Sequence, residues 1–130
     1  MNSMFISEVL RSISNLLTTN TNMAYFSELI KNQVWQRATI VEGYNSNIWR
    51  KDLVGAWIKY DQYGEQSKYG WEIDHLCPVS RGGSDDISNL NALHWRNNRR
   101  KSDDYPDFFS ELTSDGNVNV ERTQSWTVKK

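Results

Sequence analysis

The chain is poor in cysteine, in excess charge and in long apolar runs. Its 130 residues contain one cysteine, Cys77, which excludes an internal disulfide and is typical of a protein kept in a reducing compartment. A formal net charge of -1 excludes a generally basic, histone-like binder, so any nucleic-acid site must arise from local clustering of positive charge. No apolar run approaches the length of a membrane span, and the N-terminus lacks the basic and apolar segments of a signal peptide. We therefore expect a soluble, cytoplasmic protein.

Aromatic residues, by contrast, are abundant. Six Trp, six Tyr and four Phe provide large apolar side chains for a core. A chain of this length is expected to form one domain over residues 1–130. We expect four of the tryptophans to lie in its core rather than to act as base-stacking platforms: Trp35, Trp49, Trp57 and Trp71.

Two helices are expected in the N-terminal segment, residues 1–40. Apolar residues at helical spacing predict the first over Ser3–Leu17. The second should begin near Asn22, a good cap residue, and place Leu29 and Val34 on its apolar face. The first helix either packs on the rest of the chain or pairs with another subunit. A homodimer through these helices is therefore one expectation.

The regions on either side of the central segment are expected to contain shorter elements. Trp49–Asp52 is typical of a turn, and the alternation over Ala56–Tyr63 predicts a strand. The dipeptide Asp115-Gly116 predicts a hairpin between short strands within residues 108–130. We expect the last five residues to be peripheral.

The central segment predicts two strands followed by a short helix. Trp71–Cys77 is expected to form the first strand, which Pro78 ends because proline cannot donate to a strand ladder. A loop over Ser80–Ser88 carries two glycines and turn-forming polar residues. The returning strand is expected over Asn89–Trp95 and the helix over Asn97–Asp103.

This segment also holds the side chains that carry chemistry. The oxygens of Asp74 and Asn98 suit a hard cation such as magnesium, and a neutral His75 suits proton abstraction from water. Neighbouring cationic side chains suggest a phosphate substrate. Because neighbouring strand residues point to opposite faces, the strand must distort or end at Asp74 and His75 for both to reach one phosphate.

Residues Glu72–Pro106 resemble the HNH family of endonucleases, also called His-Me finger or ββα-metal nucleases. The resemblance rests on IDH, GGSDDISNL and NNRRKSDDYP at their spacing. It implies an α+β fold in which a ββα-metal core over residues 71–104 is flanked by the N-terminal helices and the C-terminal hairpin. It also implies a metal-dependent endonuclease that hydrolyses DNA.

The family's roles fall on four residues of this chain. The resemblance implies that His75 is the general base and that Asp74 and Asn98 are the protein ligands of one divalent ion, Mg²⁺ or Mn²⁺. Asn89 would brace the loop and the orientation of the base. Enzymes of this kind leave 5′-phosphate and 3′-hydroxyl ends.

The chain departs from many family members in lacking the two CxxC pairs that bind a structural zinc. The second pair's positions hold His94 and Asn97, and no CxxC precedes the motif. Because Cys77 and His94 alone cannot supply four ligands, we expect no structural zinc. We expect His94 to pack or to form a hydrogen bond.

A basic cluster beside the motif is the expected DNA-contacting surface. No acidic residue interrupts residues 88–101, so phosphate contact is favoured over a merely solvated face. The sequence does not decide between DNA and RNA. Two further hypotheses stay open: an effector nuclease controlled by a protein partner, and a DNA-binding ββα module that does not cleave. The candidate phosphate-contacting residues are Arg81, Arg96, Arg99, Arg100 and Lys101.

Overall fold

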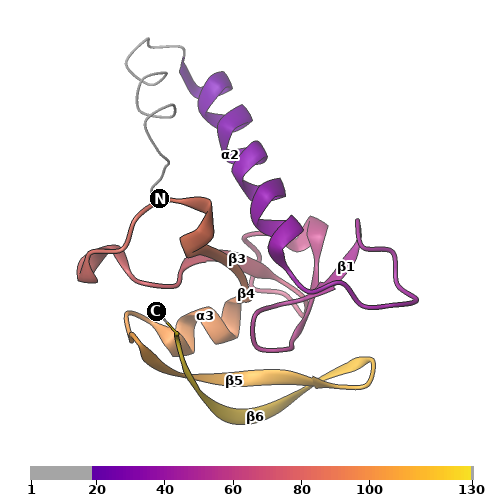
Figure 1. The fold of residues 1–130 in the computed structure, drawn as a ribbon. Coiled ribbons are helices and arrows are strands. Elements are labelled where there is room, and N and C mark those ends of the chain that lie inside the picture. The colour runs from indigo at the N-terminus through magenta and orange to yellow at the C-terminus, as the bar shows by residue number, and fades with distance from the viewer. Residues whose placement is uncertain (1–18, 130) are drawn as a thin grey trace.

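The computed structural model describes the backbone of residues 19–129 and the side chains of residues 28–129. Within that part of the chain, helices and small antiparallel sheets occur together (Figure 1), which confirms the α+β expectation. The helix predicted over Ser3–Leu17, with its proposed role in dimer formation, lies outside the described residues. Neither helix of the described part is long and apolar enough to cross a membrane.

Helix α2, Thr19–Arg37, covers one face of the central hairpin. Its buried residues Val34 and Trp35 pack in a core cluster with Trp71 and with the buried side chains of the returning strand. At the last residue of the helix, the guanidinium of Arg37 donates to the carbonyl of Leu90 at 3.0 Å. The predicted second helix is thus confirmed, although Leu29 of its expected apolar face is 41% exposed.

A two-stranded sheet follows, formed by β1, Trp49–Lys51, and β2, Trp57–Lys59. The prediction of a turn over Trp49–Asp52 was therefore wrong, and the predicted strand over Ala56–Tyr63 is shorter because a 3₁₀ turn begins at Tyr60. The reversal lies between the strands, where Oδ1 of Asp52 accepts from the backbone N–H groups of Val54 and Ala56 at 3.0 and 2.8 Å. The side chain of Asp52 therefore holds the turn, and the residues before it pair as strand β1.

The central hairpin pairs β3, Trp71–His75, with β4, Leu90–His94, and helix α3, Trp95–Lys101, follows directly. The predicted order of strand, loop, strand and helix is confirmed. Helix α3 begins two residues earlier than expected because the ring of His94 accepts from the N–H of Arg96 and caps its first turn.

A long C-terminal hairpin packs against α3, on the side away from β3 and β4 (Figure 1). It pairs β5, Asp107–Asp115, with β6, Val118–Thr127, across the predicted Asp115-Gly116 turn. These strands are nine and ten residues long, not short as expected. The tail is also less peripheral than predicted, because Trp126 packs against a buried cluster that contains Leu93 and Phe108.

Candidate active site

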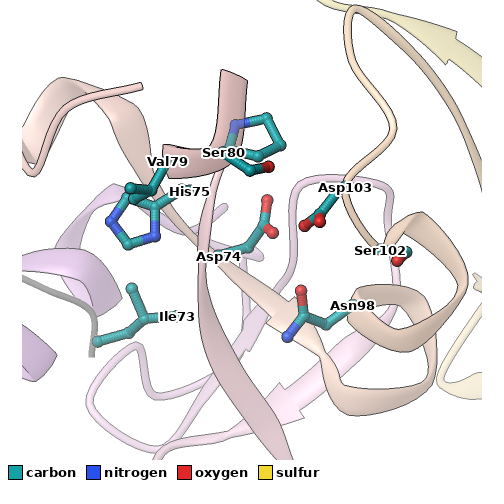
Figure 2. A pocket seen from close by; sticks show the side chains of 9 residues that line it. Ile73, Asp74, His75, Val79, Ser80, Asn98, Ser102 and Asp103 are labelled. Carbon is teal, nitrogen blue, oxygen red and sulfur yellow. The ribbon is translucent and has the colours of Figure 1, made fainter. Parts of the chain in front are cut away.

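A pocket opens where β3 ends, and it brings together Asp74, His75 and Asn98 (Figure 2). Strand β3 supplies the first two residues and helix α3 supplies the third. The loop after β3 and the end of α3 complete the walls. The other lining residues are Ile73, Pro78, Val79, Ser80, Ser102 and Asp103.

The strand keeps its regular alternation up to the pocket. Figure 2 shows the side chains of Ile73 and His75 on one side of β3 and that of Asp74 on the other, with Asn98 on the side of Asp74. The pairing register is continuous through Asp74 and His75, and the strand ends at His75. The strand therefore ends at His75 and does not distort, and side chains from its two opposite faces line one pocket at its tip.

Asp74 is a buried carboxylate with one oxygen left without a hydrogen bond. The ammonium of Lys101 lies 3.4 Å from Oδ1 and 3.2 Å from Oδ2, but only the contact to Oδ1 has hydrogen-bond geometry. Burial raises the pKa of Asp74 to about 6, although the charge of Lys101 lowers it. A buried, under-satisfied carboxylate oxygen at the wall of an open pocket is suited to bind a cation.

The side chain of Asn98 is oriented by a residue that the motif did not single out. Its Nδ2 donates to Oε1 of Glu72 at 2.7 Å, which fixes the amide so that its oxygen points toward Asp74 and Asp103 (Figure 2). Glu72 lies two residues before Asp74 and so shares its strand face. That spacing is the signal by which Glu72 could have been found.

His75 and Asn89 are both tied to the loop between the strands. The ring nitrogen Nε2 of His75 lies 2.8 Å from Oδ1 of Asp85. Asn89 accepts from the N–H of Cys77 and donates to the carbonyls of Cys77 and Ser84, at 2.9, 3.0 and 2.8 Å. The amide of Asn89 therefore links the two ends of the loop and occupies a bracing position.

Two of the five expected phosphate-contacting residues are engaged elsewhere. Lys101 is 0% exposed, because it faces the buried carboxylate of Asp74; its assignment to the DNA-contacting surface was wrong. Arg96 forms ion pairs of 2.7 Å with both Glu111 and Glu121, and these two carboxylates raise the pKa of its guanidinium. The charge of Arg96 is therefore largely neutralised by the C-terminal hairpin.

The other three remain on the surface. Arg99 and Arg100 are exposed on α3, where their guanidinium groups lie over the rings of Trp95 and Phe109. Arg81 is also exposed, and its Nε donates to the carbonyl of Asp103 at the rim of the pocket, 2.8 Å away. Of these three side chains, Arg81 brings positive charge to the rim of the pocket, because Asp103 lines it.

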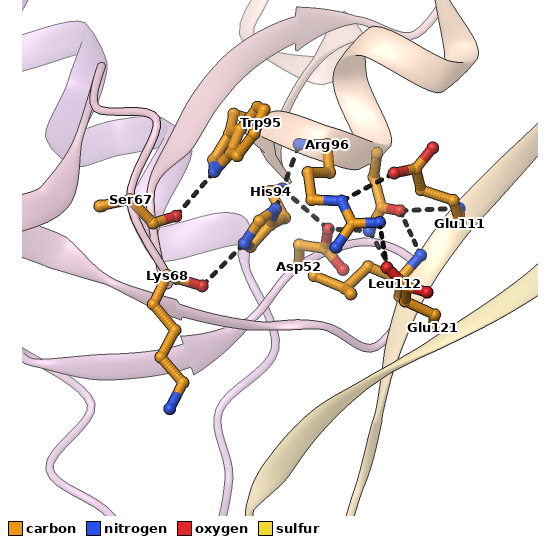
Figure 3. Close-up of polar contacts among 10 residues, drawn as sticks. Asp52, Ser67, Lys68, His94, Trp95, Arg96, Glu111, Leu112 and Glu121 are labelled. Atoms are coloured by element: carbon orange, nitrogen blue, oxygen red, sulfur yellow. Dashed lines mark hydrogen bonds and ion pairs between the residues drawn. The ribbon is translucent and has the colours of Figure 1, made fainter.

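A buried polar network lies beneath the site and holds α3 in place (Figure 3). Oδ2 of Asp52 accepts from the N–H of His94 at 2.9 Å and from Nδ2 of Asn97 at 3.0 Å. Asn97 in turn accepts from the N–H groups of Glu111 and Leu112 at 3.0 and 2.8 Å, which joins α3 to β5. Burial raises the pKa of Asp52, while these N–H donors lower it.

His94 belongs to this network and not to the pocket. Its Nδ1 accepts from the N–H of Arg96, and its Nε2 lies 2.9 Å from the carbonyl of Lys68. Burial lowers the pKa of His94, which is consistent with a neutral ring. Both ring nitrogens therefore have backbone partners. Among the described residues no group of three or more His, Cys, Asp or Glu side chains is placed to hold a metal ion, and the expected lack of a structural zinc stays a prediction.

The comparisons with known proteins bear on the same segment. Residues 61–104 match the family model described as HNH endonuclease. The matched residues contain β3, β4, α3 and every residue that lines the pocket. No curated protein and no solved structure matches the chain.

Proposed function

On the premise that residues 61–104 match the HNH endonuclease family model, we propose that the chain is a metal-dependent endonuclease that hydrolyses phosphodiester bonds of DNA. The observation that carries the proposal is the shared pocket of Asp74, His75 and Asn98 at the end of β3. A catalytic base and two oxygen ligands are the groups that metal-assisted phosphodiester hydrolysis requires.

Asp74 and Asn98 are the residues that would hold a divalent ion. The oxygen Oδ2 of Asp74 is buried without a hydrogen bond, and the amide of Asn98 is turned by Glu72 so that its oxygen faces the same space. Both are hard oxygen donors of the kind Mg²⁺ and Mn²⁺ prefer, and one or two protein ligands with water and phosphate oxygens are typical of such sites. When bound, the ion would neutralise charge that develops on the phosphate and on the leaving oxygen.

His75 would remove the proton from the attacking water. It lies at the tip of β3, 14% of its side chain is accessible, and it faces the pocket from the side opposite to Asp74. A phosphodiester placed between them would have the base on one side and the cation on the other. That arrangement suits in-line attack, in which the water and the leaving oxygen lie on opposite sides of the phosphorus.

The exposed cations beside the pocket would hold the DNA backbone. Arg99 and Arg100 follow Asn98 on α3, and Arg81 contacts the carbonyl of Asp103, which lines the pocket. Guanidinium groups bind phosphate oxygens without reading the base sequence. Binding through these residues would therefore show little sequence preference.

Plasmid cleavage tests the proposal. Purified protein is incubated with supercoiled DNA and with Mg²⁺, Mn²⁺ or a chelator, beside His75→Ala and a matched Asp86→Ala variant. Asp86 lies in the same loop, is exposed and forms no side-chain cap bond. We expect nicking by the wild type and by Asp86→Ala, only with metal, and a loss of at least about 100-fold in His75→Ala. Intact DNA under all cations, despite gel-shift binding, would instead favour the non-cleaving module.

A further inference from the structure

We propose that Asp85 is a positioning residue for His75: it holds the Nε2–H tautomer of the imidazole, so that Nδ1 is the nitrogen that accepts the proton from water. The inference rests on the proposed function, because it names the residue that prepares the base of that same site. It is carried by one contact, the 2.8 Å distance between Nε2 of His75 and Oδ1 of Asp85.

The chemistry of the pair determines the direction of this hydrogen bond. An ionised carboxylate only accepts, so the ring nitrogen that faces Asp85 must carry a proton. In a neutral imidazole the other nitrogen then has a lone pair and acts as the base. Asp85 is not among the residues that line the pocket, so its bond engages Nε2 on the loop side and leaves Nδ1 for the pocket. Figure 2 shows one ring nitrogen of His75 on the side of Asp74 and the other directed away from it.

The loop that carries Asp85 is held in place on both sides. The amide of Asn89 donates to the carbonyl of Ser84, the residue before Asp85, at 2.8 Å. The same side chain accepts from the N–H of Cys77, two residues after His75. Asn89 therefore fixes Asp85 relative to the strand end that carries the base. The bracing role of Asn89 is therefore to hold Asp85 in place relative to His75.

A conformational constraint also supports the arrangement. The loop turns back on itself at Gly83, where a Cβ atom would lie 1.7 Å from the carbonyl oxygen of Cys77. Only glycine permits this close approach, which brings the following residues, Ser84 and Asp85, back toward the end of β3. The side chain that reaches His75 is thus placed by the backbone as well as by Asn89.

Two substitutions separate the roles of the carboxylate. Asp85→Ala removes the acceptor, whereas Asp85→Asn keeps an oxygen that can accept from Nε2–H but removes the charge. Asp86→Ala is the matched control in the same loop, since its side chain forms no cap bond. We expect kcat to fall by about tenfold to 100-fold in Asp85→Ala and by less in Asp85→Asn, with KM for DNA and Mn²⁺ affinity within about twofold of wild type.

The tautomer is measured directly by ¹⁵N chemical shifts of the His75 ring, in metal-free protein at a pH at which the ring is neutral. Wild type should show a protonated Nε2 and an unprotonated Nδ1, and Asp86→Ala the same. Asp85→Ala should show the averaged shifts of an exchanging imidazole. This readout does not depend on cleavage, so it stays informative if the protein is not a nuclease.

The outcomes are distinct. A wild-type ring with its proton on Nδ1, or unchanged shifts in Asp85→Ala, would overturn the positioning role whatever the activity. Wild-type kcat in Asp85→Ala would overturn it as well. Absence of cleavage in the wild type, with the expected tautomer present, would overturn the proposed function but leave the Asp85 and His75 pair established.

Discussion

The ammonium of Lys101 lies 3.2 Å from Oδ2 of Asp74, and both side chains are shielded from solvent. Lys101 is fully buried and also donates to the carbonyl of His75 at 3.2 Å. One cation of α3 thus contacts both strand residues that the proposed mechanism uses. A buried ion pair of this kind orients a ligand carboxylate, but it depends on both partners being present.

Breaking this pair on one side should destabilise the protein strongly. In Lys101→Met the carboxylate of Asp74 stays buried without its cation, which we expect to lower the free energy of unfolding by about 3–5 kcal/mol at neutral pH. Urea unfolding measures the loss. The double variant Lys101→Met with Asp74→Asn should recover part of it, because the remaining amide carries no charge. A single variant as stable as wild type would show that the pair contributes no net stability.

The raised pKa of Asp74 predicts a pH dependence of stability. The carboxyl binds its proton more tightly in the folded protein, with a pKa of about 6, than in the unfolded chain, where the ordinary value is 3.8. Stability should therefore fall as pH rises from about 4 to about 6 and then level off. Compared with Asp74→Asn, in chelator, the wild type should lose on the order of 3 kcal/mol across that window. A difference that does not vary with pH would contradict the burial of this carboxylate.

Two neighbouring asparagines should separate stability from activity. Asn97→Ala removes the acceptor for the N–H groups of Glu111 and Leu112 and a donor to Asp52, so we expect a loss of about 3 kcal/mol or more in unfolding experiments. Asn98→Ala should change stability by only about 1 kcal/mol but reduce cleavage by at least about 100-fold. Equal effects on stability would contradict the division between a structural and a metal-binding amide.

Salt dependence should identify the cations that contact DNA. Replacing Arg99 or Arg100 with Gln should weaken binding to any DNA sequence and lower the slope of log affinity against log salt by about 1 for each residue. Arg96→Gln should leave the slope unchanged, because Glu111 and Glu121 already neutralise that side chain. Fluorescence anisotropy at several salt concentrations measures both, and Arg122→Gln on β6 is the charge-matched control.

Local patterns in the sequence were enough to predict the central strands, the helix and the residues that meet in the pocket. Pro78 marked the limit of the first central strand, the two loop glycines indicated the reversal, and Asp115-Gly116 indicated the last turn. The burial of Lys101 could also have been found, since it lies four residues after Asn97 and so on the same face of α3. Its place in a cationic run favoured phosphate contact instead.

Other features depend on contacts that local patterns do not specify. The ion pairs of Arg96 with Glu111 and Glu121 require β5 and β6 to pack against α3. The contact between Asp85 and His75 requires the loop to fold back. The sequence does not distinguish Asp85 from Asp86, because both are carboxylates in the same turn-forming run. Long-range packing decides these side chains, and periodicity does not report it.

The central claim is that His75 acts as the base and Asp74 as a metal ligand. It is tested most directly by Mn²⁺ titration and single-turnover cleavage, each carried out on His75→Ala and on Asp74→Ala. We predict that His75→Ala binds Mn²⁺ with wild-type affinity but does not cleave DNA, whereas Asp74→Ala neither binds the ion nor cleaves. Cleavage by His75→Ala at the wild-type rate, or wild-type Mn²⁺ binding by Asp74→Ala, would contradict the account.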